Sequence, residues 1–165
     1  MTDKTEPEII KNWEGEKTKP LVSICCIAYN HENYINEALD SFLMQVTDFP
    51  FEIIVRDDAS VDSTAEVIKE YKKKFPNIIK PIYETTNQYT KGIKPFPVTY
   101  KNAVGKYIAL CESDDYWIDK NKLQKQVNFL EKNSDYNFSV SSYHTIDEKK
   151  KIKLGESFRT KTNNL

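Results

Sequence analysis

Apolar and polar positions alternate in blocks along this chain, and the blocks predict strands and helices in turn. Four near-continuous apolar runs are typical of strands that are buried in a parallel sheet. These runs cover residues 21–28, 51–56, 78–83 and 106–111. Apolar residues at helical spacing predict the intervening helices. The helices cover residues 34–43, 63–75, 98–104 and 119–132, and a last short strand is predicted at 137–142.

This order of elements predicts an α/β fold, with a mainly parallel sheet and helices on both faces, as in Rossmann-like domains. Right-handed crossovers would place the turns after Ala28, Arg56 and Cys111 along one edge of the sheet.

The domain itself is predicted at residues 20–146. The polar residues 1–19 are expected to form a flexible N-terminal arm, with docking of Ile9, Ile10 and Trp13 on the domain as the alternative. Residues 147–165 are rich in lysine and are expected to form a basic tail, or the start of a further C-terminal part that this chain lacks.

One cluster of acids follows the strand predicted at 106–111. Glu112, Asp114 and Asp115 would repel one another unless a cation lay between them. Mg²⁺ and Mn²⁺ prefer oxygen ligands of this kind. For this cluster alone, a solvated acidic loop is an equally good interpretation.

A second acidic pair, Asp57 and Asp58, follows the strand at 51–56 and precedes a helix that Asp62 or Ser63 could cap. Ligands of open α/β sheets bind where strands end and helices begin. An aspartate there can accept a hydrogen bond from a ribose hydroxyl or a base N–H. A plain turn or cap residue is the alternative.

Composition narrows the classes of function. Hydrophobic residues make up 39% of the 165 positions and charged residues 30%, and a net charge of −1 gives no general reason to bind nucleic acid. The chain has no GxGxxG motif and no P-loop. Neither a signal peptide nor a membrane-spanning run is apparent, which favours a cytoplasmic protein, at most peripheral to a membrane.

The cysteines and histidines do not form a metal-binding pattern. Cys25, Cys26 and Cys111 lie in or at the end of predicted strands, so buried free thiols of a reducing compartment are expected. His31 and His144 are far apart in the sequence and give no spacing typical of a zinc site.

Four blocks of sequence, taken together and in order, resemble family 2 glycosyltransferases, which have the nucleotide-sugar-binding GT-A fold. They include a first strand ending in Tyr-Asn, the turn "EIIVRDDASVDST" and the segment "GKYIALCESDDYW". The blocks cover residues 22–30, 34–45, 52–64 and 105–126. The resemblance extends over about residues 20–145.

The resemblance implies a role for each matching residue at the nucleotide. Tyr29 would border the uracil, with Ile27 beside it at the end of the first strand. Asp58 would contact the base, and Asp57 would support the turn. Ala59 stands where the family commonly has glycine, which would be tolerated if its φ angle is negative.

The acidic segment matches the family's Asp-X-Asp signature. Glu112 and Ser113 would lie near the nucleotide, Asp114 and Glu112 would bind Mn²⁺ or Mg²⁺, and Asp115 would lie near the sugar or in the outer sphere of the metal. Glu112 replaces the usual aspartate and adds one methylene, which alters the geometry of that ligand.

The implied activity is metal-dependent, inverting transfer of a sugar from UDP or a similar nucleoside diphosphate to an acceptor hydroxyl. Relatives act on polysaccharide or lipid-linked acceptors at the inner face of the membrane. The family's catalytic base lies further along than Leu165, so no residue here is assigned to it. The alternative is a nucleotide-sugar-binding module that lacks the acceptor site and base.

Two other classes fit less well. A nucleotidyltransferase would need a glycine-rich basic loop after the first strand, and this chain has none. A plain α/β interaction domain would carry two carboxylate clusters at strand ends by chance. The sequence does not specify the donor sugar, the acceptor or the oligomeric state.

Overall fold

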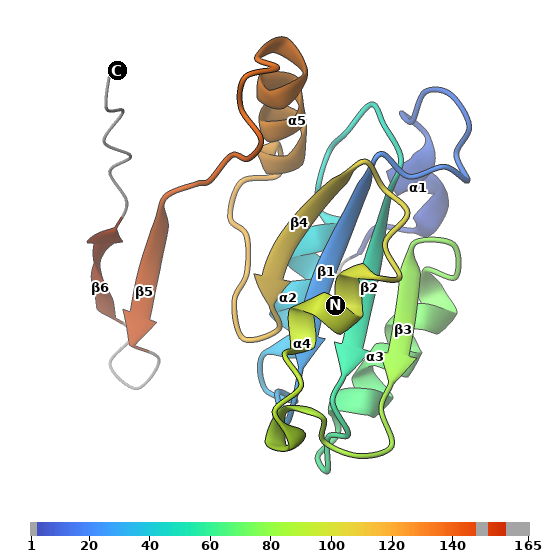
Figure 1. Cartoon of the computed structure of the whole chain (residues 1–165). Helices are drawn as coiled ribbons and strands as arrows, with labels where there is room; N and C mark the ends of the chain where they lie inside the picture. The colour runs from blue at the N-terminus through green and yellow to red at the C-terminus, as the bar shows by residue number, and fades with distance from the viewer. Residues whose placement is uncertain (1–2, 148–151, 158–165) are drawn as a thin grey trace. The chain divides into compact units, whose positions relative to one another are not determined.

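The computed structural model describes residues 3–147 and 152–157 (Figure 1). The chain divides into two compact units, Met1–Lys125 and Gln126–Leu165. The first unit contains the sheet and the candidate site.

A four-stranded, fully parallel sheet forms the centre of the first unit. It consists of β1 (Val22–Ala28), β2 (Phe51–Asp57), β3 (Ile79–Tyr83) and β4 (Tyr107–Glu112), in the order β3-β2-β1-β4. The predicted parallel sheet and its strands are therefore confirmed, with bounds within one residue of those read from the sequence. β2 is buried along its whole length, as a central strand covered on both faces should be.

Helices lie on both faces of this sheet, as predicted (Figure 1). α2 (Ile35–Leu43) and α3 (Thr64–Lys74) lie behind it in the view of Figure 1, and α4 (Pro95–Tyr100) crosses the front of β1 and β2. α4 begins earlier than the predicted 98–104 because Pro95 occupies its first turn, where proline's fixed φ favours a helix start. A 3-10 turn, η1 (Tyr89–Lys91), precedes it. α5 (Lys122–Lys132) spans the boundary between the two units.

The N-terminal segment, expected to be a flexible arm, is docked on the first unit. It contains α1 (Glu6–Ile10), and Ile9 and Trp13 are buried. The Trp13 ring meets Phe51 edge-on, with 5.2 Å between the centroids. The carboxylate of Glu6 accepts hydrogen bonds from the backbone N–H and the side-chain amide of Asn77. Burial of two large apolar side chains explains why the segment packs despite its polar composition.

The strand predicted at 137–142 is wrong. Residues 137–142 form no strand. The next strand is β5 (Tyr143–Asp147), which pairs antiparallel with β6 (Ile152–Ser157). Part of the expected tail at 147–165 therefore forms a strand. Its residues 148–151 and 158–165 lie outside the described part of the chain.

In the described part of the chain, no helix has both the length and the apolar character that crossing a membrane requires.

Candidate functional site

Three turns meet at the carboxyl edge of the sheet. They are the first turn (residues 29–34, after β1), the second turn (57–63, at the end of β2) and the acidic turn (112–117, at the end of β4). Ala28 is paired with Asp57, and Ile27 with Glu112, so the three strands end side by side. The arrowheads of β1, β2 and β4 mark this edge in Figure 1. The predicted gathering of these turns is confirmed.

Asp57 holds the second turn together. Its carboxylate is buried and accepts hydrogen bonds from both the backbone N–H and the hydroxyl of Ser60. Burial raises the pKa of Asp57 above its usual range, although the Ser60 hydrogen bonds act in the opposite direction. The carboxylate is thus occupied by its own turn.

Ala59 has a φ of +62°, so the condition under which alanine would replace the family's glycine without strain is not met. A Cβ atom in the left-handed region costs roughly 1–2 kcal/mol. Replacing Ala59 with glycine should remove this strain, but it also makes the unfolded chain more flexible. We therefore expect Ala59→Gly to raise the free energy of unfolding, by at most about 1 kcal/mol. Urea unfolding of both proteins tests this, and a lower stability of the variant would contradict the backbone assignment.

Asp58 is the centre of a buried ionic cluster. Its Oδ1 lies 3.0 Å from Nη2 of Arg56, whose side chain is completely buried and whose Nε donates to Glu84 Oε1, also at 3.0 Å. Oδ1 and Oδ2 also accept the backbone N–H groups of Gln88 and Tyr89. Asp58 therefore anchors the loop that follows β3 to the second turn.

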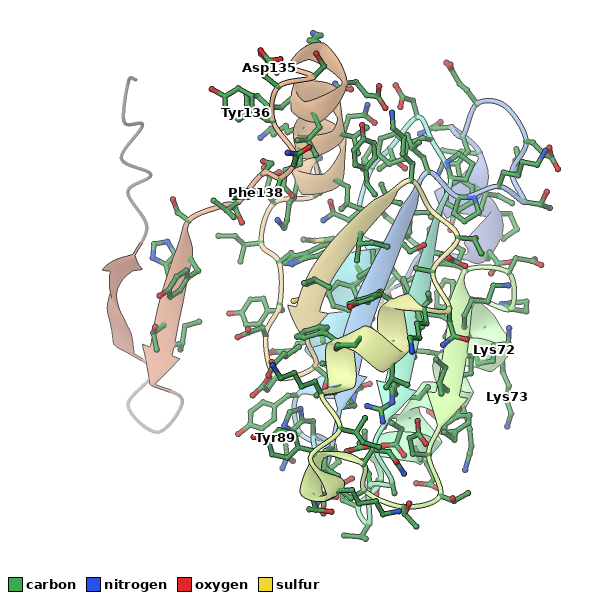
Figure 2. The ribbon with its side chains drawn as sticks, viewed as in Figure 1. Lys72, Lys73, Tyr89, Asp135, Tyr136 and Phe138 are labelled. Carbon is green, nitrogen blue, oxygen red and sulfur yellow. The ribbon has the colours of Figure 1, made fainter. Side chains whose placement is uncertain are left out.

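This loop borders the carboxyl edge. Tyr89, labelled in Figure 2, projects from η1 and is mostly exposed. A hollow of about 350 Å³ is lined by η1 and the residues after it: Tyr89, Thr90, Gly92, Ile93 and Lys94. The backbone bonds of Gln88 and Tyr89 hold this loop against Asp58.

The first turn interlocks with the second. Asn30, which has a φ of +54°, donates its backbone N–H to Ser60 Oγ, and its Oδ1 accepts the N–H of Val61. Glu32 and Asp62 exchange similar bonds between the turns: Glu32 N–H donates to Asp62, and Ser63 N–H donates to Glu32. Tyr29 is left 42% exposed at the start of this turn. The first and second turns, which carry Tyr29, Asp57 and Asp58, are thus joined by hydrogen bonds into one frame, here called the nucleotide-side frame.

The acidic turn separates buried from exposed side chains. Ser113 is fully buried and donates its N–H to the carbonyl of Ile27, whereas Glu112, Asp114 and Asp115 are exposed. Partial burial, and then repulsion from Asp114 and Asp115, raise the pKa of Glu112. Burial and the charge of Asp114 likewise raise the pKa of Asp115. The turn therefore concentrates negative charge at the edge of the site.

The donor set of this turn fits a hard divalent cation, because every exposed ligand is a carboxylate. In the described residues, no three His, Cys, Asp or Glu side chains converge into a ready-made cage. Mg²⁺ is commonly held by one or two carboxylates together with substrate phosphates, and this turn has the groups for that mode.

The repulsion in the acidic turn predicts a pH dependence. A raised carboxyl pKa means that the folded state takes up protons more readily than the unfolded state, so this turn's contribution to stability falls as pH rises above about 4–5. Without metal, Asp115→Asn should be more stable than wild type at pH 7, and the difference should shrink towards pH 4.5. Urea unfolding across this range measures it. Glu70→Gln, which removes an exposed acid of α3, serves as the control.

Sequence reasoning missed three residues at this edge. Arg56 was assigned only to a strand. A cation next to an Asp pair at the end of an apolar run could have indicated a buried ion pair. Glu84 gave no signal. His31 was considered only as a zinc ligand, whereas its ring lies against Ser113, with 2.7 Å between Nδ1 and Oγ.

A parallel sheet with its polar turns at the carboxyl edge defines an α/β domain of the nucleotide-binding class. The family model for glycosyl transferase family 2 matches residues 23–165. The chain belongs to this family, and the resemblance drawn from its four sequence blocks is confirmed.

Two relatives match this chain over two thirds or more of its length. An uncharacterized protein of Mycobacterium tuberculosis is 47% identical over 112 residues, which are 67% of this chain and 32% of that protein. The UDP-Glc:alpha-D-GlcNAc-diphosphoundecaprenol beta-1,3-glucosyltransferase WfaP of Escherichia coli is 38% identical over 125 residues, or 75% of this chain and 46% of the enzyme.

Among solved structures, S. aureus TarS in complex with UDP-GlcNAc superposes with a TM-score of 0.59 at 35% identity. The match covers 68% of this chain and 32% of the TarS chain. It confirms the GT-A fold. The chain spans between about a third and a half of the length of these relatives.

Proposed function

We propose that this chain is the donor-binding part of a glycosyltransferase that uses a UDP-linked sugar. The observation that carries the proposal is the convergence, at one sheet edge, of Asp58 with its bound loop and of the exposed carboxylates of the acidic turn. The printed names of relatives, which include UDP-Glc and UDP-GlcNAc, support it.

The uracil would be recognised at Asp58. A carboxylate has about four lone-pair sites, and three hydrogen bonds to Asp58 are seen, two at Oδ1 and one at Oδ2. Oδ2 can therefore accept the N3–H of uracil. Arg56 Nη1 is buried without a hydrogen-bond partner in the described residues, and offers a donor for a neighbouring carbonyl of the base.

The remaining residues would serve the ribose, diphosphate and sugar. Tyr29 and Ile27 border the base, and Asp57 keeps the second turn in shape through Ser60. Asp114, with Glu112, would hold Mn²⁺ or Mg²⁺, which supplies positive charge to the diphosphate leaving group when bound. Asp115 would lie near the sugar or orient the metal's water shell, and Ser113 would support the turn from below.

The complete enzyme would transfer the sugar with inversion: the acceptor hydroxyl attacks the anomeric carbon as the bond to the diphosphate breaks. A base must take the hydroxyl proton. We assign no residue of this chain to that base. The lipid-linked acceptor in the name of the E. coli relative supports a lipid-linked acceptor for the complete enzyme. By itself, this chain would act as a nucleotide-sugar-binding module.

Saturation-transfer NMR with UDP-glucose, UDP-GlcNAc and GDP-mannose, each with the diamagnetic ion Mg²⁺, tests the donor class. Saturation should reach the uracil protons of both UDP-sugars, and excess UDP should abolish it. Asp58→Asn should weaken both signals, because an amide nitrogen facing N3–H repels it. Preference for GDP-mannose, or equal signals from all three, would contradict uracil recognition.

A further inference from the structure

His31 connects the first turn to the start of α3 and to the acidic turn. Its backbone N–H donates to Thr64 Oγ1 at 2.8 Å, at the start of α3. Its ring shares a hydrogen bond of 2.7 Å between Nδ1 and Ser113 Oγ, and Nε2 lies 4.0 Å from a carboxylate oxygen of Asp114. One side chain therefore reaches from the nucleotide-side frame to the acidic turn.

The contact with Ser113 is constrained from both sides. Ser113 is completely buried, and its N–H is already donated to Ile27 at 3.0 Å. The imidazole is the partner that the structure gives to the Ser113 hydroxyl. A buried hydroxyl without a partner is costly, so loss of the imidazole should shift the turn or admit water. Asp114 is the next residue and would move with it.

The ring itself is held in place. It meets Tyr34 edge-on, with 6.1 Å between the centroids and an interplanar angle of 87°. Because Nδ1 is occupied by Ser113, the other nitrogen is directed towards Asp114. The side chain is 25% exposed, so it borders the site without standing free in solvent.

We infer that His31 is a positioning residue of the donor site, which fixes the Ser113–Asp114 segment in the place where the cation and diphosphate bind. This inference rests on the proposed function and deepens it. His31 belongs to the first turn, beside the proposed place of the base, but it would align the acidic turn, where the diphosphate and the cation would bind. The expected consequence is selective: loss of His31 weakens binding of the diphosphate and metal but leaves binding of the base intact.

The test uses the whole chain and three probes. Binding of Mn²⁺ alone is measured by electron paramagnetic resonance, binding of UDP with Mn²⁺ by calorimetry, and binding of uridine by NMR titration. His31→Leu removes both ring nitrogens, and Ser113→Ala removes the hydroxyl. Each should weaken binding of Mn²⁺ and UDP·Mn²⁺ by roughly tenfold, as loss of an outer-shell partner typically does. Uridine affinity should stay within about twofold.

Two further variants separate positioning from general support. His31→Asn keeps an amide nitrogen near the place of Nδ1 and should restore most of the UDP·Mn²⁺ affinity. The double variant His31→Leu/Ser113→Ala should bind no more weakly than either single variant, because the two residues act through one contact.

The outcomes distinguish this inference from the proposed function. Wild-type affinity of His31→Leu for UDP·Mn²⁺ would overturn the inference, and so would an equal loss of uridine and UDP binding, which would show only general support of the fold. If the wild type binds Mn²⁺ in a His31-dependent way but no UDP, the proposed function fails and the positioning role stands. Binding of neither ligand by the folded wild type would overturn both.

Discussion

Replacing Arg56 with methionine is expected to lower the free energy of unfolding by about 3–5 kcal/mol, the usual result of breaking a buried ion pair. The guanidinium is completely buried, and it neutralises the buried carboxylate of Asp58 on one side and meets Glu84 on the other. Methionine fills much of the space but leaves Asp58 without its counter-charge. Unfolding by guanidinium chloride, followed through tryptophan fluorescence, measures the loss.

Two companion variants show whether charge or volume is responsible. Arg56→Lys keeps the charge but cannot reach Asp58 and Glu84 with a planar fork, so its loss should be intermediate. Asp58→Asn combined with Arg56→Met removes both charges and should recover part of the stability. A loss of less than about 1 kcal/mol in Arg56→Met would mean that the pair is solvated, contrary to the burial seen here.

Asp114→Asn is expected to weaken Mn²⁺-supported binding of UDP by roughly 5- to 700-fold. Charges about 4 Å apart interact by about 1–4 kcal/mol between bulk water and a protein surface, and each 1.4 kcal/mol corresponds to a factor of ten in affinity. Asp114 is the exposed central acid of the turn, and its neighbour Ser113 is held firmly. Calorimetric titration of UDP in the presence of Mn²⁺ measures the change.

The control for this variant is Glu70→Gln, which removes the same charge from an exposed position on α3. It should bind UDP as wild type does. Equal weakening by both variants would attribute the effect to net charge, and undiminished binding by Asp114→Asn would remove this residue from the cation site.

Much of this architecture could be predicted because the strands of a parallel sheet are read directly from their apolar runs. Once β1, β2 and β4 are recognised, the handedness of crossovers brings Tyr29, Asp58 and Glu112 to one edge. These rules predict where the site lies, but they do not identify its ligand or its metal.

What the sequence could not show depends on contacts between distant residues. The bond between His31 and Ser113 joins residues 82 positions apart, and no local pattern indicates it. The positive φ of Ala59 follows from the way the second turn closes on Asp57. The antiparallel pairing of β5 with β6 was missed because the strand was expected earlier, at residues 137–142.

How the N-terminal segment packs depends on distant contacts in the same way. Residues 1–19 are polar on average, but Ile9 and Trp13 are buried, and the Trp13 ring meets Phe51 of β2. Average composition does not reveal a small number of well-placed apolar contacts.

The three turns should together form a metal-assisted site for UDP. Calorimetric titration of UDP into the wild-type chain, first with Mn²⁺ and then with a chelator, tests this most directly. We expect binding with Mn²⁺ that is lost or strongly weakened when the metal is removed. A folded protein that gives no binding heat with Mn²⁺ and shows no uridine contacts by NMR would contradict it.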